Sequence, residues 1–467
     1  MAPIKSSLSR SASKLLGVFR DRDLSLRGFV QKSKFINPFS VAQFYFGDSR
    51  DGDLTASGGT VTLSSQPSPA APGGVCSSFR VSNLTSTRIT ISSPHGNNVF
   101  TAGDKVLLYQ RNTSVPESNK VGTYSIHDVA SVPSTTTIDI SNDYAGTVPG
   151  SESISTPSFK EDSSGPSPSA AANRVYVVRI AQFGTATVNG GTVTTAQDST
   201  HAGIVAIAAQ TSITVSSGSI TAAGLGYYAG DGAPSGPPIS SPNSGGKGQA
   251  YNTEPWTGAN NPAVPGHTNT PAYEIGGGGG AHNPGSFSGG AGGGGSIMVG
   301  ANGGGDGPGA GAGDGGGAYP TPRRDTTGAS RLSTGGGGGG GADTTGTPGG
   351  RGGGIVLLFA PSITISGGTV SARGLATPTN SGPSVDSGGG GGGGTVLIRG
   401  ETVALGTDLV TSKGGDQGGT YTPDGFGGAG GGGMVAVYAP SITGSVTNTT
   451  AGSTSQNPSY YSSSWTV

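Results

Sequence analysis

The sequence predicts an all-β fold: a glycine-rich β-solenoid with packed polyglycine helices, preceded by a small β-domain and an N-terminal anchor. Gly supplies 92 of the 467 residues, whereas hydrophobic residues make up only 31% and charged residues only 11%. Such a composition leaves little material for a large side-chain core. In the second half of the chain, β-forming runs recur at a regular spacing, and glycine tracts lead directly into them. Because buried N–H and C=O groups need partners, we expect the glycine backbones to hydrogen-bond to one another.

Residues 1–50 are predicted to be an anchoring arm. Residues 1–34 hold eight Lys or Arg and two Asp, a net charge of +6. Several apolar residues are spaced to share one face of a short helix, and more apolar side chains follow than so short an arm could bury alone. A solvated amphipathic arm is the alternative interpretation. The candidate anchoring residues are Leu8, Leu15, Phe19, Leu24, Leu26 and Phe29.

Residues 51–158 are predicted to form a small β-barrel or sandwich that acts as an adaptor domain. Short runs of high β-propensity, separated by turn residues, are typical of such a meander. The predicted strands cover residues 60–63, 79–81, 87–91, 105–110, 122–129 and 135–140. Residues 159–172, rich in Ser, Pro and Ala, are predicted to be a linker.

Residues 173–448 contain the repeats, and residues 449–467 are predicted to be a C-terminal tail. The clearest unit is GIVLLFAPSITISGGTVSARG from Gly354, and related units begin at Gly203, Gly394 and Gly433. The last three starts lie 40 and 39 residues apart, and residues 174–197 resemble a divergent first copy. Each unit holds three short strands separated by turns, which is typical of the coils of a β-solenoid.

Glycine tracts separate these units. A flexible linker would explain one tract, but not several that each enter an apolar strand. We therefore expect extended helices with three residues per turn, packed side by side and hydrogen-bonded to their neighbours. Disordered low-complexity sequence is the alternative. The tracts are residues 276–280, 292–295, 335–341, 388–394 and 430–433.

Motifs for catalysis or cofactor binding are not found, so the sequence predicts neither an enzyme nor a cofactor. The glycine-rich segments lack the Gly-Lys-Ser/Thr ending of a phosphate-binding loop. The five histidines are isolated, Cys76 is the single cysteine, and no carboxylate pair stands out, so we nominate no metal or catalytic residue. The glycine region has one Arg-Gly-Gly and few aromatics, which argues against nucleic-acid binding. No run approaches the roughly 20 apolar residues of a membrane span, so no membrane insertion is expected.

Aromatic and basic residues inserted among the glycine tracts are the candidates for binding. Exposed aromatic rings stack on sugars and anchor interfaces efficiently. Covering the scaffold or contacting a sister subunit is an equally good explanation of the same residues. The candidate receptor-binding residues are Tyr227, Tyr228, Trp256, Tyr273, Tyr319, Arg323, Arg324, Tyr421 and Phe426.

The repeat pattern, a glycine run followed by strand motifs such as APSIT and GTVSARG, resembles glycine-rich repeat proteins of phage fibres and bacterial surfaces over roughly residues 174–448. The tracts are similar to those of polyglycine-sandwich tail-fibre adhesins, in which loops between glycine helices touch the host receptor. The start, MAPIKSSLSRSASKLLGVFRDRDLSLRGF, resembles virion-anchoring starts of tail-fibre proteins. Real strands and a separate β-domain set this chain apart from the tip adhesins.

The resemblance implies a phage virion structural protein, a tail- or head-attached fibre or spike that presents loops for host attachment. Its partners would be other virion proteins through the N-terminus, sister copies in a homo-oligomer with a trimer favoured, and a host-surface glycan. The expected location is the virion, after assembly in the host cytoplasm. A secreted bacterial surface or filament protein is one alternative, disfavoured by the lack of a signal peptide. A polysaccharide-cleaving spike is another, and it would need a carboxylate pair in one cleft.

Overall fold

The structure is a computed structural model of the whole chain, and it is all-β where it is described. All twenty elements bounded there are strands, and eighteen of them belong to one hydrogen-bonded network. The described residues are 46–96, 99–112, 121–144, 154, 159, 174–196, 203–230, 248, 277, 282–283, 287–288, 291, 293–304, 315–316, 331–341, 346–377, 387–418, 426–446 and 459–463.

An antiparallel sheet forms the first part of the network. Strand β5 pairs with β6 on one side and with β8 on the other, and β4 pairs with β3 and β7. Apolar side chains from these strands form their own core cluster, which includes Val106, Leu108 and Val177. The strands are β3 (Ser78–Leu84), β4 (Arg88–Ile91), β5 (Lys105–Asn112), β6 (Tyr124–Ser134), β7 (Thr137–Asp143) and β8 (Arg174–Thr194). They lie where the sequence predicts β-runs.

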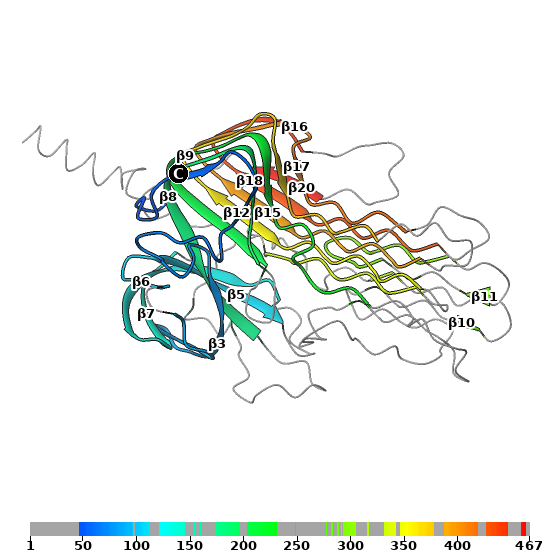
Figure 1. Cartoon of the computed structure of the whole chain (residues 1–467), viewed down its shortest axis with the longest axis horizontal. Helices are drawn as coiled ribbons and strands as arrows, with labels where there is room; N and C mark the ends of the chain where they lie inside the picture. Colours follow the sequence, from blue (N-terminus) through cyan, green and yellow to red (C-terminus); the bar gives the residue numbers. More distant parts are fainter. Residues whose placement is uncertain are drawn as a thin grey trace, which may run out of the picture.

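Strand β8 connects this sheet to the repeats (Figure 1). Its first half pairs antiparallel with β3 and β5, and its second half pairs parallel with β9 (Ile204–Thr221). Two short strands, β1 (Leu54–Ala56) and β2 (Thr60–Thr62), pair parallel with that second half. The repeat region is expected to begin at residue 173. That position lies directly before β8, a single strand that pairs with both the antiparallel sheet and the repeats.

The repeats stack on β9 through parallel pairing in register. Ile204 pairs with Ile355, which pairs with Thr395, which pairs with Met434, so equivalent positions of successive units lie side by side. The first strands of the units are β12 (Ile355–Phe359), β15 (Thr395–Arg399) and β18 (Met434–Tyr438), followed by β20 (Ser459–Ser463). The second strands are β13 (Ser362–Ile365), β16 (Thr402–Thr407) and β19 (Ser441–Ser445), and the third are β14 (Thr369–Ser371) and β17 (Val410–Thr411). A separate two-stranded pair, β10 (His282–Asn283) and β11 (Phe287–Ser288), lies apart from the rest.

Burial follows the sequence pattern of each strand. All five residues of β12, β15 and β18 are buried, as expected of strands covered on both faces. In β13 the residues alternate, with Ile363 and Ile365 inside and the hydroxyl residues half-buried. One core cluster runs from Phe46 through the copies to Val446, so the repeats and the chain that precedes them share a single apolar interior.

Candidate functional site

Glycine tract 388–394 is the centre of a backbone hydrogen-bond layer next to the strands. Six consecutive N–H groups, from Gly389 to Gly394, donate to carbonyl oxygens at 2.7 to 3.0 Å. Their acceptors belong to three different neighbours in strict rotation. Gly389 and Gly392 donate to Gly339 and Gly336; Gly390 and Gly393 donate to Gly428 and Gly431; Gly391 and Gly394 donate to Leu375 and Ala372. Residues three apart therefore face the same neighbour.

The same spacing of three joins the other segments of the layer. In one antiparallel pair, Gly335, Gly338 and Gly341 donate to residues 353, 350 and 347. In another, residues 298, 301 and 304 donate to residues 432, 429 and 426. In Figure 1 these segments run side by side from the strands toward β10 and β11. The arrangement gives the buried backbone groups partners without side chains.

Glycine is required in the layer because the neighbouring backbones approach so closely. A Cβ atom at Gly391 would lie 2.1 Å from the carbonyl oxygen of Arg351, and one at Gly338 would lie 1.9 Å from that of Gly389. These contacts are with backbone atoms, which cannot turn aside as the end of a side chain can. The glycines are thus needed for their lack of volume. Tracts 335–341, 388–394 and 430–433 lie wholly within the residues that the structure describes, whereas tracts 276–280 and 292–295 lie there only in part.

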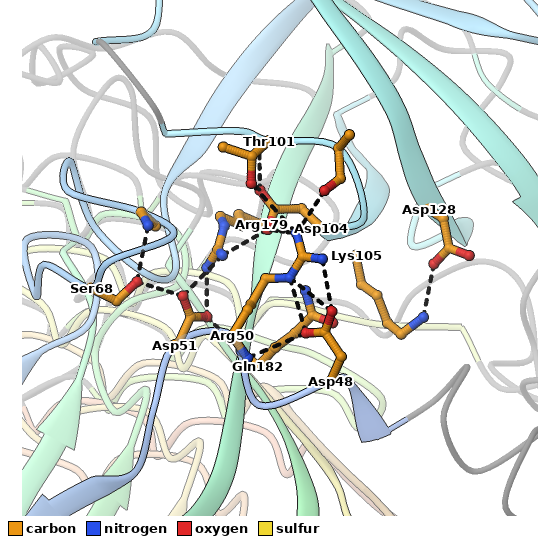
Figure 2. Close-up of polar contacts among 12 residues, drawn as sticks. Asp48, Arg50, Asp51, Ser68, Thr101, Asp104, Lys105, Asp128, Arg179 and Gln182 are labelled. Atoms are coloured by element: carbon orange, nitrogen blue, oxygen red, sulfur yellow. Dashed lines mark hydrogen bonds and ion pairs between the residues drawn. The ribbon is translucent and has the colours of Figure 1, made fainter.

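A buried ion-pair cluster fixes the junction between the antiparallel sheet and the repeats (Figure 2). Arg179 lies on β8, within the apolar run RVYVVRI, and its guanidinium has no exposed surface. It donates two hydrogen bonds to Asp51, at 2.7 and 3.0 Å, and one to Asp104, at 2.7 Å. A further bond, at 2.9 Å, reaches the carbonyl of Val75.

Two loops supply the carboxylates. Asp51, in the turn before β1, also accepts the N–H of Gln182 at 2.8 Å. Asp104, in the turn before β5, accepts a hydrogen bond from the N–H of Thr101 at 2.7 Å and forms an ion pair with Arg50 at 3.0 Å. The cluster therefore ties β8, the β1 turn and the β5 turn together at one point.

The electrostatics of the cluster keep its arginines charged. Burial lowers the pKa of Arg179, but the charges and hydrogen bonds of Asp104 and Asp51 outweigh this, so the net shift is upward. The hydrogen bonds of Asp48 raise the pKa of Arg50. Burial in turn raises the pKa of Asp48, yet the bonds and charge of Arg50 dominate and leave it lowered.

The cluster is suited to holding β8 and the two turns together, and it is not suited to acid–base catalysis. The carboxylates of Asp51 and Asp104 have no exposed surface, and each is paired with an arginine. A general acid or base must reach a substrate and exchange its proton near the working pH. Breaking a buried pair of this kind leaves an uncompensated charge, which makes the cluster costly to disrupt.

Three of the candidate binding residues are described, and each lies in a different environment. Tyr227 is fully buried, and its hydroxyl donates to the carbonyl of Arg111 at 2.7 Å, so its ring packs inside the protein. Tyr228 lies 4.7 Å from the guanidinium of Arg351 in a cation–π contact. Phe426 is 42% exposed, beside the glycine layer. The other candidates, Trp256, Tyr273, Tyr319, Arg323, Arg324 and Tyr421, lie outside the described residues, as do the anchoring candidates Leu8, Leu15, Phe19, Leu24, Leu26 and Phe29.

Metal and membrane sites do not emerge from the described part of the chain. No group of three or more His, Cys, Asp and Glu there is arranged to hold a metal ion. His127 is buried, with its ring nitrogens against the Ser125 hydroxyl and the Asn142 carbonyl. Among the same residues, no helix has the length and apolarity to cross a membrane.

Sequence reasoning missed the ion-pair cluster. The signal was present in two places: a charged residue, Arg179, interrupts an apolar strand, and the acidic turn GDSRDGD (47–53) stands out in a chain with few charges. Nothing local links the two, because they lie 128 residues apart. A search of protein-family models, curated proteins and solved structures found no match to this chain.

Proposed function

We propose that the chain is a phage virion fibre or spike protein, and that its repeats form a glycine-rich β-solenoid extended by packed polyglycine helices. The observation that favours this architecture is the rotation of hydrogen-bond acceptors along residues 389–394. A helix with three residues per turn, such as polyproline II, presents every third residue to the same neighbour. Copy-to-copy pairing of β12, β15 and β18 in register supports the solenoid coils.

A rigid projecting body is what this construction favours. In the units that begin at Gly394 and Gly433, an apolar strand continues directly from a glycine tract, so pairing of the strand also fixes the position of the tract. Surface loops on such a body need no catalytic machinery to bind a host glycan weakly. Several copies on one particle would then raise the avidity without new contacts.

The junction fits the same function. The N-terminal arm joins the described chain at Phe46, a buried residue of the shared core. The loop that follows supplies Asp51 to the Arg179 cluster. A force applied through the arm would thus pass to β8 and on to the repeats through buried contacts and not through a free linker.

Labelling of particles tests the proposal. Antibodies against residues 51–467 should label intact virions, and a chain that lacks residues 1–45 should no longer be incorporated while remaining folded. A full-length chain with the exposed Gly58→Ala change is the matched control and should be incorporated normally. Label found only on bacterial surfaces or filaments would instead support the secreted surface protein and refute the virion role. Release of oligosaccharides from host glycans by purified chain would refute the non-enzymatic mechanism and support the polysaccharide-cleaving spike.

A further inference from the structure

Lys105 places an amine in the interior of the antiparallel sheet, directly opposite a carboxylate. It pairs in register with Asp128 on the neighbouring strand, and only 6% of its side-chain surface is exposed. Its Nζ donates to Oδ1 of Asp128 at 2.8 Å, and Figure 2 shows the two side chains reaching toward each other. The amine is thus held against the carboxyl group, and reaction is favoured where the reacting atoms lie about 3–3.5 Å apart.

The two oxygens of Asp128 have different surroundings. Oδ1 faces the amine, whereas Oδ2 accepts two hydrogen bonds, from the Tyr144 hydroxyl at 2.5 Å and from the Asn142 side chain at 2.9 Å. Donors aimed at one oxygen stabilise negative charge there as the carbonyl carbon is attacked. Of the two donors, the Tyr144 hydroxyl also positions a proton for that oxygen when it leaves. Oδ2 is therefore the better leaving oxygen.

Burial makes the amine of Lys105 easier to deprotonate than that of an exposed lysine. Burial lowers its pKa, against the opposing charges of Asp128 and Asp48, and Arg50 lowers it further. The ring of Tyr144 lies 5.2 Å from Nζ in a cation–π contact, which holds the charged amine in place before it loses a proton. Burial activates a lysine as a nucleophile once that proton is lost.

We propose that Lys105 and Asp128 join in an intramolecular amide bond between β5 and β6. One proton passes from the ammonium to the carboxylate, and neutral Nζ then attacks Cγ of Asp128. The Cγ–Oδ2 bond breaks, and Oδ2 leaves as water with two of the three ammonium protons, one of them relayed through Tyr144. No oxidant, reductant or net charge is needed, because an ammonium and a carboxylate become an amide and a water molecule.

The bond would reinforce the junction of the molecule. Lys105 follows Asp104, which holds Arg179 in the buried cluster, and β5 also pairs with β8. A covalent link at this point would keep β6 attached to β5 under force. The inference goes beyond the proposed fibre function and is independent of it, because it concerns the chemistry of one buried pair.

Mass spectrometry of the denatured full-length chain tests the proposal. We expect the intact mass to fall short of the sequence mass by one water molecule, and a digest to yield a branched peptide that joins the segments of Lys105 and Asp128. Lys105→Arg and Asp128→Ala should each restore the full mass, whereas Arg88→Lys, at an exposed ion pair, should leave the deficit in place. Tyr144→Phe keeps the ring and should slow bond formation.

The contrary outcomes are equally clear. A wild-type chain of full mass after days of incubation overturns the proposal, and so does a deficit of one ammonia, which would make Asn142 the partner. Loss of water confined to a single linear peptide would also overturn it, because a cyclised aspartate gives that result. The wild-type measurement decides the question even where a variant fails to fold.

Discussion

Replacing Gly391 with Ala should destabilise the glycine layer strongly. The new Cβ would lie 2.1 Å from the carbonyl oxygen of Arg351, whereas ordinary contact begins near 3.4 Å, so the two segments must separate by 1.3 Å (3.4 − 2.1). Between these segments, Gly350 and Gly353 donate to the carbonyls of residues 389 and 392, each at 2.8 Å. A separation of that size breaks both bonds. The two buried N–H groups left without partners, at about 1–3 kcal/mol each, alone give a loss of roughly 2–6 kcal/mol.

Denaturant unfolding followed by circular dichroism measures this loss, and hydrogen exchange of the amides of residues 389–394 locates it. The matched control is Gly58→Ala, because Gly58 is exposed and a Cβ there meets nothing within 4 Å. That change should be neutral, or stabilise the chain by up to about 1 kcal/mol by restricting the unfolded state. If Gly391→Ala leaves both the unfolding free energy and the amide protection as in the wild type, the close packing inferred for the layer is refuted.

Three further predictions concern Asp104, Cys76 and Asp48. Asp104→Ala should lower the free energy of unfolding by about 3 kcal/mol, because Arg179 loses one of its two buried carboxylate partners. Asp139→Ala, at an exposed ion pair, should change the denaturation midpoint little. Equal effects of the two changes would contradict the role of burial. Burial raises the pKa of Cys76 to about 11, so the native thiol should resist alkylation. Because the unfolded thiol ionises first, the free energy of unfolding should fall between about pH 9 and about pH 11. Rapid alkylation of the native protein would contradict this. The pKa of Asp48 is lowered, so its contribution to stability is present above its unfolded pKa and is lost as pH falls through the folded value; Asp48→Asn should flatten acid unfolding curves, and an unchanged acid slope would refute the assignment.

The sequence predicted the strands well because their signals are local. The unit from Gly354 is predicted to hold three short strands separated by turns, and the structure has three strands there, at Ile355–Phe359, Ser362–Ile365 and Thr369–Ser371. Fully apolar runs and short alternating runs are readable without knowledge of the partner strand. The prediction of an all-β fold is confirmed to that extent.

The ion-pair cluster and the fate of Tyr227 could not be predicted in this way. Arg179 meets Asp51 only because β8 passes the turn before β1, a contact between residues 128 positions apart. Tyr227 sits in a segment rich in glycine and tyrosine that looks like a surface loop, but its hydroxyl finds a buried carbonyl 116 residues away. Amphipathic rings serve both surfaces and interiors, and the sequence does not distinguish the two.

Tract 388–394 consists of identical residues, so a shift of the tract by one position puts a Gly where a Gly was before. The strand β15 fixes the end of tract 388–394, so one extra Gly inserted after Gly388 would push the additional residue out into the chain before residue 387. Every position of tract 388–394 would still be occupied by Gly, and the longer connection costs only a few tenths of a kcal/mol. Deleting one Gly instead draws Ser387 into the place of Gly388, where a Cβ would lie 2.4 Å from the carbonyl oxygen of Pro348.

The insertion should therefore be neutral in denaturant unfolding, and the deletion should cost less than Gly391→Ala because it disturbs only the outer end of the tract. An insertion as damaging as Gly391→Ala would mean that the tract is held from its loop end. In that case strand β15 would not set the register of the tract.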